Sequence, residues 1–282
     1  MIRIIPRIDI KGNNLVKGLN LEGLRVLGNP NDFAYKYYLD GADEIIFQDV
    51  VASLYSRENL YKVIKDAAKK IFIPITVGGG IKSLDEISKI LRSGADRVSI
   101  NSAAIRDREF LSAAITKYGS STIASNIELV KSYDDNEYYA FMDNGRNNSK
   151  IKAIDWISEL VRLNVGEIIL TFVGTEGTGR GIDLNFLKKI EKIINCPLVV
   201  HGGIGKIKHI ENILNYSSVN GLVISSMFHY YYYQEFDYSK ITTGNIEFIK
   251  NKIKTKLIDE YSIKNLKDYL ISKSYQIIDH EA

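Results

Sequence analysis

Two short glycine-rich segments of this 282-residue chain have the composition of anion-binding loops. One is Gly-Gly-Gly at 78–80 and the other is Gly-Gly at 202–203, and each follows a run of β-branched and apolar residues. Glycines let backbone N–H groups approach a phosphate closely, although a plain chain reversal explains one such run equally well. The next apolar runs end in further donors, Asn101 with Ser102 and two serines at 225–226. This repeated pairing favours two anion sites, which would suit a substrate with a phosphate at each end.

Two acidic residues lie at the ends of other apolar runs. Asp9 is near the end of the run at 4–10, and Glu128 is near the end of the run at 122–129. Two carboxylates that face a bound substrate can divide general-acid and general-base catalysis between them. Strand alternation also puts Arg7 on the face of Asp9, so a structural ion pair explains Asp9 equally well.

Four charged residues stand at the opposite ends of the same runs: Arg3, Glu44, Arg97 and Glu167. By alternation all four can point inward and form a ring of two positive and two negative charges. Buried charges usually occur in pairs, so one interpretation is a neutral salt-bridge plug. The alternative is a gated opening.

The elements that must position these residues are eight runs alternating with helical patterns. Residues 107–118, 151–163, 183–194 and 206–215 have helical spacing, and Ser83 with Glu86 forms a capping box before another helix. Eight strand-helix units predict a (β/α)8 barrel, since an open doubly wound sheet usually alternates fewer times. In a barrel, functional residues lie at the carboxyl ends of the strands. The runs are 4–10, 44–50, 73–77, 97–101, 122–129, 167–173, 197–201 and 221–225.

The second half of the chain repeats the first. The interval from Glu44 to Glu167 equals the interval from Gly79 to Gly202, and similar segments surround both pairs. A recurring interval at successive strand ends indicates an internal duplication of a half-barrel.

The composition restricts the class of protein. The numbers of basic and acidic residues, 37 and 34, are nearly balanced, so the net charge of +3 does not indicate a nucleic-acid or membrane partner. The single cysteine excludes an internal disulfide and a cysteine-rich metal site, so we expect a cytoplasmic protein. The charged N-terminal segment does not resemble a signal peptide, and the chain has no apolar run of membrane-spanning length. No cofactor motif is found in a strand-turn-helix context.

Long ordered motifs then identify a family. The segments RIDIKGNNLVKG, GADEIIFQDVVAS, IPITVGGGI, GADRVSINSAA, GEIILTFVGTEGTGRGID and VVHGGIGK resemble the cyclase subunit of imidazole glycerol phosphate synthase, a histidine-biosynthesis barrel. The resemblance covers about residues 1–229. It implies a heterodimer in which a glutaminase docks at the barrel floor and releases ammonia through the barrel. The ammonia then converts a bis-phosphorylated aminoimidazole-carboxamide ribonucleotide into imidazole glycerol phosphate, with no cofactor or metal.

The same resemblance assigns roles to individual positions. Asp9, Glu128 and Glu176 match catalytic or active-site carboxylates, and the ring of four charges matches the ammonia gate. The positions matched to substrate and phosphate binding are Lys17, Gly80, Asn101, Ser102, Thr171, Gly177, Gly203 and Ser226.

The chain also departs from the family pattern near the active site. Glu128 and Glu176 stand where aspartate is usual, and His201 stands where serine is usual. The polar residues Arg7, Gln48 and Asn126 replace small or apolar ones and are predicted to form a polar layer beneath the mouth, with Arg7 paired to Asp9 or Glu128. These changes are also compatible with an alternative hypothesis, in which the barrel is not a cyclase but conducts ammonia to a sugar-amidation enzyme. A third hypothesis is a sugar isomerase of the same barrel family, which would explain the two anion sites and two carboxylates but not the ring of four charges.

The length beyond a minimal barrel is concentrated after the eighth run. The family match resumes near Ser262 with a predicted last helix, so we expect one domain over 1–282 with an insertion at about 230–261.

Overall fold

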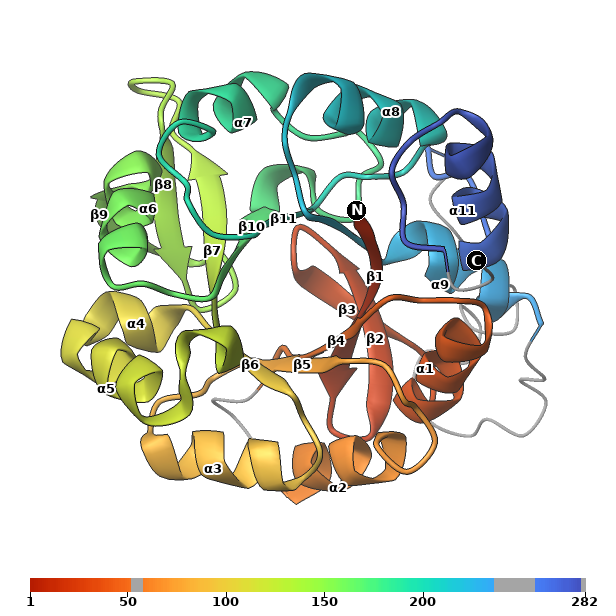
Figure 1. The fold of residues 1–282 in the computed structure, drawn as a ribbon, viewed down its shortest axis with the longest axis horizontal. Helices are drawn as coiled ribbons and strands as arrows, with labels where there is room; N and C mark the ends of the chain where they lie inside the picture. Colours follow the sequence, from red (N-terminus) through yellow and green to blue (C-terminus); the bar gives the residue numbers. More distant parts are fainter. Residues whose placement is uncertain (52–57, 236–256, 280–282) are drawn as a thin grey trace.

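Eight parallel strands close into a barrel in the computed structural model, which describes residues 1–51, 58–235 and 257–279. The barrel closes where the last strand pairs with the first, with Arg3 opposite Gly221. Figure 1 shows the helices as a ring around these strands, so the predicted (β/α)8 fold is confirmed. The barrel strands are β1 (Arg3–Lys11), β4 (Ile45–Asp49), β5 (Ile75–Gly78), β6 (Arg97–Ile100), β7 (Ile123–Lys131), β10 (Glu167–Phe172), β11 (Leu198–His201) and β12 (Gly221–Ile224).

Most of the surrounding helices bury one apolar face against the strands, whereas α9 is buried on nearly all sides. On α3, Ile87 and Ile90 are buried, and the Ser83 hydroxyl caps the helix by accepting from the Glu86 N–H at 3.2 Å. The Glu86 carboxylate accepts from the Lys82 N–H at 2.8 Å. The helices are α1 (Pro30–Leu39), α2 (Glu58–Ala67), α3 (Leu84–Arg92), α4 (Ser102–Arg106), α5 (Arg108–Tyr118), α6 (Ala153–Arg162), α7 (Leu184–Ile190), α8 (Ile207–Tyr216), α9 (Ser226–Tyr233) and α11 (Ile263–Ser272).

Two antiparallel hairpins interrupt the alternation of strand and helix. The first is β2 (Asn14–Leu19) with β3 (Glu22–Gly28), and the second is β8 (Tyr138–Met142) with β9 (Asn147–Lys152). They extend β1 and β7, the first barrel strand of each half. The expectation that a helix directly follows every strand is therefore wrong at these two positions, because each hairpin strand has at most one β-branched residue, whereas β-branched runs mark the barrel strands.

The interior of the barrel is layered, because side chains of a strand alternate between its two faces. A ring of charges lies at the amino ends of the strands, and an apolar ring follows it: Ile5, Ile46, Ala124, Ile169, Val199 and Val223. Two residues further along each of these strands is a polar residue, and these six form what we call the polar layer: Arg7, Gln48, Asn126, Thr171, His201 and Ser225. All six are buried. The polar layer predicted from three residues thus exists and extends around the barrel.

The glycine runs adopt matching conformations in the two halves. Gly79 and Gly202 have φ of +103° and +102°, in the left-handed region that favours glycine. A Cβ at either position would collide with the end of the preceding strand, 2.1 Å from the Asp49 carbonyl oxygen or 2.6 Å from that of Phe172. The same backbone geometry at both sites supports the internal duplication.

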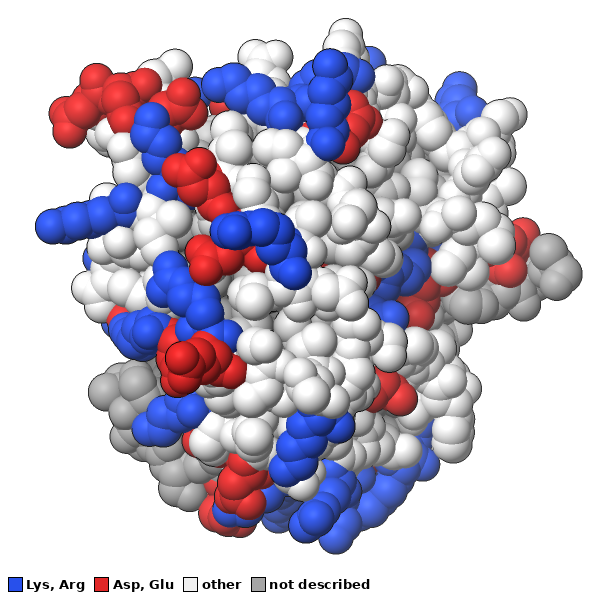
Figure 2. Space-filling view, turned by 60° about the vertical axis from the view of Figure 1, so that its left-hand side comes forward, with Lys and Arg blue, Asp and Glu red and all other residues white. Residues whose placement is uncertain are grey.

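The C-terminal part contains the last predicted helix, α11, beginning after Ser262 as expected. The proposed insertion begins within α9, where Tyr230, Tyr232 and Tyr233 are buried, and most of it lies outside the described residues, at 236–256. None of the described helices is long and apolar enough to cross a membrane. On the face shown in Figure 2, basic and acidic side chains intermingle.

Candidate active site

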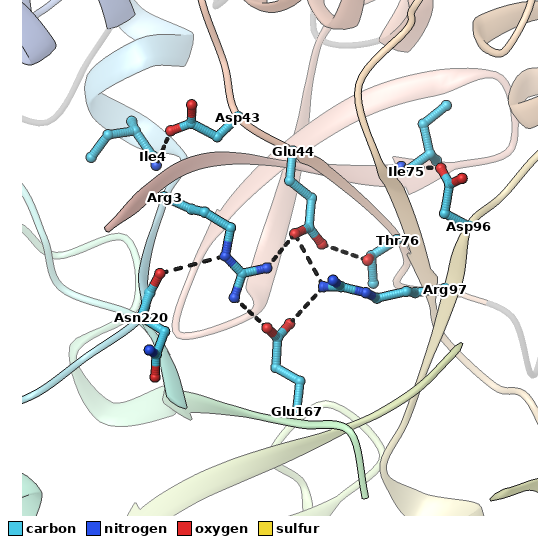
Figure 3. A network of polar contacts seen from close by, with 10 residues as sticks. All are labelled: Arg3, Ile4, Asp43, Glu44, Ile75, Thr76, Asp96, Arg97, Glu167 and Asn220. Atoms are coloured by element: carbon cyan, nitrogen blue, oxygen red, sulfur yellow. Dashed lines mark hydrogen bonds and ion pairs between the residues drawn. The ribbon is translucent and has the colours of Figure 1, made fainter. Parts of the chain in front are cut away.

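The four floor charges form a closed ring of alternating sign (Figure 3). Arg3 contacts the carboxylates of both Glu44, at 2.6 Å, and Glu167. Arg97 reaches the same two carboxylates at 3.3 Å each, and the Thr76 hydroxyl donates to Glu44 at 2.6 Å. Glu44 is only 1% exposed, whereas the side chains of Arg3 and Arg97 are 16% and 28% exposed. The predicted ring is therefore present, and its arginines are partly exposed at the barrel floor.

Asp9 lies at the mouth, directly above the polar layer. Its Oδ1 accepts from Arg7 Nε at 2.7 Å, and both side chains are 5% exposed. Burial raises the pKa of Asp9, while the charges of Arg7 and Lys17 oppose that shift. Of the two partners considered for Arg7, the structure selects Asp9.

Glu128 is held by the turn of the second hairpin. Its Oε2 accepts from the Gly145 N–H at 2.7 Å. Asn144, in the same turn, donates from Nδ2 to the Val50 carbonyl at 2.8 Å, so the turn reaches across the mouth. Burial raises the pKa of Glu128 to about 7, against the opposing effects of the Gly145 N–H and the Arg7 charge. A carboxyl with this pKa can donate or accept a proton near neutral pH.

Glu176 is paired with Lys17, and both are buried. The other Glu176 oxygen accepts from the Leu21 N–H at 3.2 Å, which fixes the first hairpin against the loop after β10. Lys17 was expected to bind phosphate, and its Nζ lies beside Gly177, 3.1 Å from the position of a Cβ there.

The first predicted anion site lines a large cavity of about 1080 Å³. Gly80, Asn101 and Ser102 all border it, together with Glu128. The Ser102 hydroxyl accepts from the Asp143 N–H at 2.9 Å, which brings the second hairpin turn to the edge of the cavity. Basic side chains, among them Lys82, Arg106 and Arg146, line it together with a similar number of acidic ones, and Arg106 pairs with Asp143.

The second predicted anion site is a separate, narrower pocket. Gly177, Gly203 and Ser226 border it together with His201. Its volume of about 10 Å³ is close to that of one water molecule, so a phosphate must displace part of its lining, which includes Ile258. Together the two pockets contain six of the eight positions expected to bind substrate.

Lys17, which pairs with Glu176, and Thr171 are the two of those eight positions that line neither pocket. Thr171 is fully buried within the polar layer, where its hydroxyl donates to Asn126 Oδ1 at 2.8 Å. Because the Thr171 hydroxyl contacts Asn126 inside the barrel, Thr171 positions Asn126 and does not line either anion pocket. Sequence reasoning could not anticipate this cross-strand contact.

Reasoning from the sequence also missed the contribution of the second hairpin turn. Asp143, Asn144 and Gly145 have φ between +57° and +74°, a left-handed turn that aims the Gly145 N–H at Glu128. The Asn-Gly pair between two alternating segments was the signal that could have revealed it. Within the described residues, no three His, Cys, Asp or Glu side chains gather as metal ligands.

Gly203 offers a direct test of the second pocket. It has φ of +78°, and a Cβ there would lie 2.2 Å from the Gly181 carbonyl oxygen. Gly203→Ala is expected to lower the free energy of unfolding by about 3 kcal/mol and to weaken phosphate binding, because overpacking adds to backbone strain. Gly174→Ala is the matched control, since a Cβ there meets nothing within 4 Å. Urea unfolding of both variants measures the difference, and equal stabilities would contradict it.

Comparison with known proteins agrees with this geometry. The family model described as "Histidine biosynthesis protein" matches residues 3–234. A Legionella pneumophila protein named imidazole glycerol phosphate synthase subunit HisF is 44% identical over 207 residues, which is 73% of this chain and 97% of the relative. A protein of the same name from Natranaerobius thermophilus is 33% identical over 275 residues, 98% of both chains. A third, from Lactococcus lactis, is 37% identical over 263 residues, 93% of this chain and 98% of the relative. A barrel with these motifs, matched over most of its length, belongs to the histidine biosynthesis protein family.

Proposed function

We propose that this chain is the cyclase subunit of an imidazole glycerol phosphate synthase. The observation that carries the proposal is the vertical order within one barrel: a charged ring at the floor, and two buried carboxylates and two anion pockets at the mouth. The named relatives support this enzyme more than the conducting scaffold. In the proposed reaction, ammonia and a bis-phosphorylated aminoimidazole-carboxamide ribonucleotide give imidazole glycerol phosphate, aminoimidazole-carboxamide ribonucleotide and one water molecule.

Asp9 and Glu128 would share the proton transfers of this reaction. Glu128, with a pKa of about 7, can supply a proton to a departing oxygen or nitrogen and take one from the attacking nitrogen. Arg7 holds Asp9 in place at 2.7 Å, so Asp9 approaches the substrate in one orientation. The two anion pockets would fix the ends of the substrate, one beside Gly80 and the other beside Gly203.

A glutaminase subunit bound at the floor would supply the ammonia. The floor ring gives such a partner a polar entrance, because Arg3 and Arg97 are partly exposed while Glu44 and Glu167 are buried between them. The apolar ring above it favours neutral ammonia over the ammonium ion, since an apolar environment disfavours charge.

Arg3→Ala distinguishes an ammonia gate from a purely structural plug. Glu44 and Glu167 would then share Arg97 alone, which disturbs the entrance without touching the mouth. We expect glutamine-dependent turnover with a glutaminase partner to fall about tenfold, equivalent to about 1.4 kcal/mol, while ammonium-dependent turnover changes much less. Equal losses in both assays would indicate a plug. Lys69→Ala, which removes an exposed ion pair with Asp66, is the control and should change neither rate.

Genetic complementation tests the proposed function as a whole. The gene is expressed in a histidine-requiring bacterium that lacks its own cyclase subunit, with ammonium in the medium. Growth without histidine is expected, and the Asp9→Asn variant should not support it. Failure of the wild-type chain, when it accumulates in folded form, contradicts the proposal.

A further inference from the structure

One path of hydrogen bonds joins the first carboxylate to the second anion pocket. Arg7 donates from Nε to Asp9 Oδ1 at 2.7 Å, and its Nη1 lies 3.3 Å from His201 Nδ1. On the other side of the ring, His201 Nε2 lies 3.4 Å from the Ser225 hydroxyl. Asp9, Arg7, His201 and Ser225 are all buried, and they come from two strands, β1 and β11, and from the residue that directly follows β12.

The partners of His201 determine which ring nitrogen carries the proton. A guanidinium group has only donors, so His201 Nδ1 must accept from Arg7. In the neutral ring the proton then lies on Nε2, which donates to the Ser225 hydroxyl. Burial, followed by the positive charges of Arg7 and Lys17, holds the pKa of His201 well below its usual range. His201 is therefore a neutral imidazole with its N–H directed away from Arg7.

Ser225 occupies the N-cap position of α9 but does not cap the helix through its side chain. Its oxygen is directed to His201, and Ser226, the first residue of α9, borders the second anion pocket. The N–H groups of the first turn of a helix favour anions. His201, Ser225 and the start of α9 thus present donors to one pocket, and Glu176 at its edge is neutralised by Lys17.

We propose that His201 binds the phosphate-bearing end of the substrate through its Nε2–H, and that Arg7 is a positioning residue for both His201 and Asp9. This inference deepens the proposed function and rests on it for the identity of the substrate. A phosphate oxygen that enters the pocket would take the place of the Ser225 hydroxyl as acceptor, since a charged acceptor forms the stronger hydrogen bond. Arg7 then links the position of that phosphate to the orientation of the carboxylate.

Two substitutions at position 201 separate the two ring nitrogens. The amide of glutamine reaches about as far as Nε2 and can still donate in the pocket, whereas asparagine reaches only as far as Nδ1. His201→Asn is expected to raise KM for the ribonucleotide about tenfold with kcat nearly unchanged, which corresponds to about 1.4 kcal/mol. His201→Gln should restore most of that loss. Equal KM values in the wild type and His201→Asn would overturn the binding role.

Arg7→Lys tests the positioning role. A lysine ammonium carries the charge but lacks the planar fork that reaches Asp9 and His201 together. We expect kcat to fall and KM to rise in Arg7→Lys, whereas His201→Asn is expected to change only KM. A variant with normal kcat would overturn the link to Asp9.

Nitrogen NMR of the wild-type protein gives a test that needs no turnover. The chain has four histidines, and the signal lost in His201→Asn assigns the ring of interest. We expect a neutral ring protonated at Nε2, whose Nε2 signal shifts as inorganic phosphate is added. A ring protonated at Nδ1, or no response to saturating phosphate, would overturn the inference. If the ribonucleotide is not turned over while His201 responds to phosphate, the proposed reaction fails and this binding role stands.

Discussion

Asp9→Asn is expected to abolish turnover and to destabilise the barrel. The asparagine cannot exchange a proton as the carboxylate does, and loss of a general acid or base lowers rates by about 10²–10⁴. It also leaves the buried Arg7 without its anionic partner at 2.7 Å, which costs about 3–5 kcal/mol in comparable buried pairs. Steady-state rates with ammonium and urea unfolding measure the two effects.

A second buried ion pair provides the control for the loss of stability. Lys267 Nζ lies 2.7 Å from Asp43 Oδ1, and Asp43 Oδ2 accepts from the Ile4 N–H near the amino end of β1. Asp43→Asn is expected to destabilise the protein by a similar amount and to retain turnover at temperatures where it is folded. If both variants lose activity in parallel with stability, Asp9 has no special role in the reaction.

Glu128→Gln is expected to inactivate the enzyme as Asp9→Asn does, but to stabilise the folded protein near neutral pH. Glutamine keeps an oxygen to accept from the Gly145 N–H but cannot transfer a proton. The rate should fall by about 10²–10⁴, as for other general acids and bases. Glu128→Asp is the companion variant: its shorter side chain draws the carboxylate away from Gly145, and a full rate there would show that the glutamate geometry is unimportant.

The stability of Glu128→Gln should depend on pH in a defined direction. Burial raises the pKa of Glu128 from 4.5 to about 7, so the folded protein binds this proton more tightly than the unfolded chain does. The wild type therefore loses stability as pH rises from about 4.5 to 7, and the glutamine variant does not experience this loss. The variant should be more stable by about 3 kcal/mol above pH 7 and nearly equal to the wild type at pH 4. A difference that does not vary with pH would contradict the raised pKa.

Much of the barrel could be predicted because its signals are local. Each of the eight strands is a short β-branched run, and alternation along β1 correctly placed Arg3, Arg7 and Asp9 on the inner face. The glycines at 79 and 202 could be assigned to turns because few other residues tolerate their backbone angles.

The contacts that define the mouth could not be predicted, because they join distant parts of the chain. The Arg7 and His201 contact spans 194 residues, and the Lys17 and Glu176 pair spans 159. The same applies to the Gly145 N–H, which reaches Glu128 only because a hairpin folds back over the mouth. Sequence alternation identifies the face of a residue but not the partner it meets there.

Ammonium-dependent turnover by the purified chain tests the proposed function most directly. The wild-type protein is incubated with the bis-phosphorylated ribonucleotide and an ammonium salt at a pH above neutral, and both products are quantified. We predict that the substrate disappears while imidazole glycerol phosphate and aminoimidazole-carboxamide ribonucleotide form in equal amounts. Folded wild-type protein that leaves the ribonucleotide intact at high ammonium concentration would contradict the cyclase function.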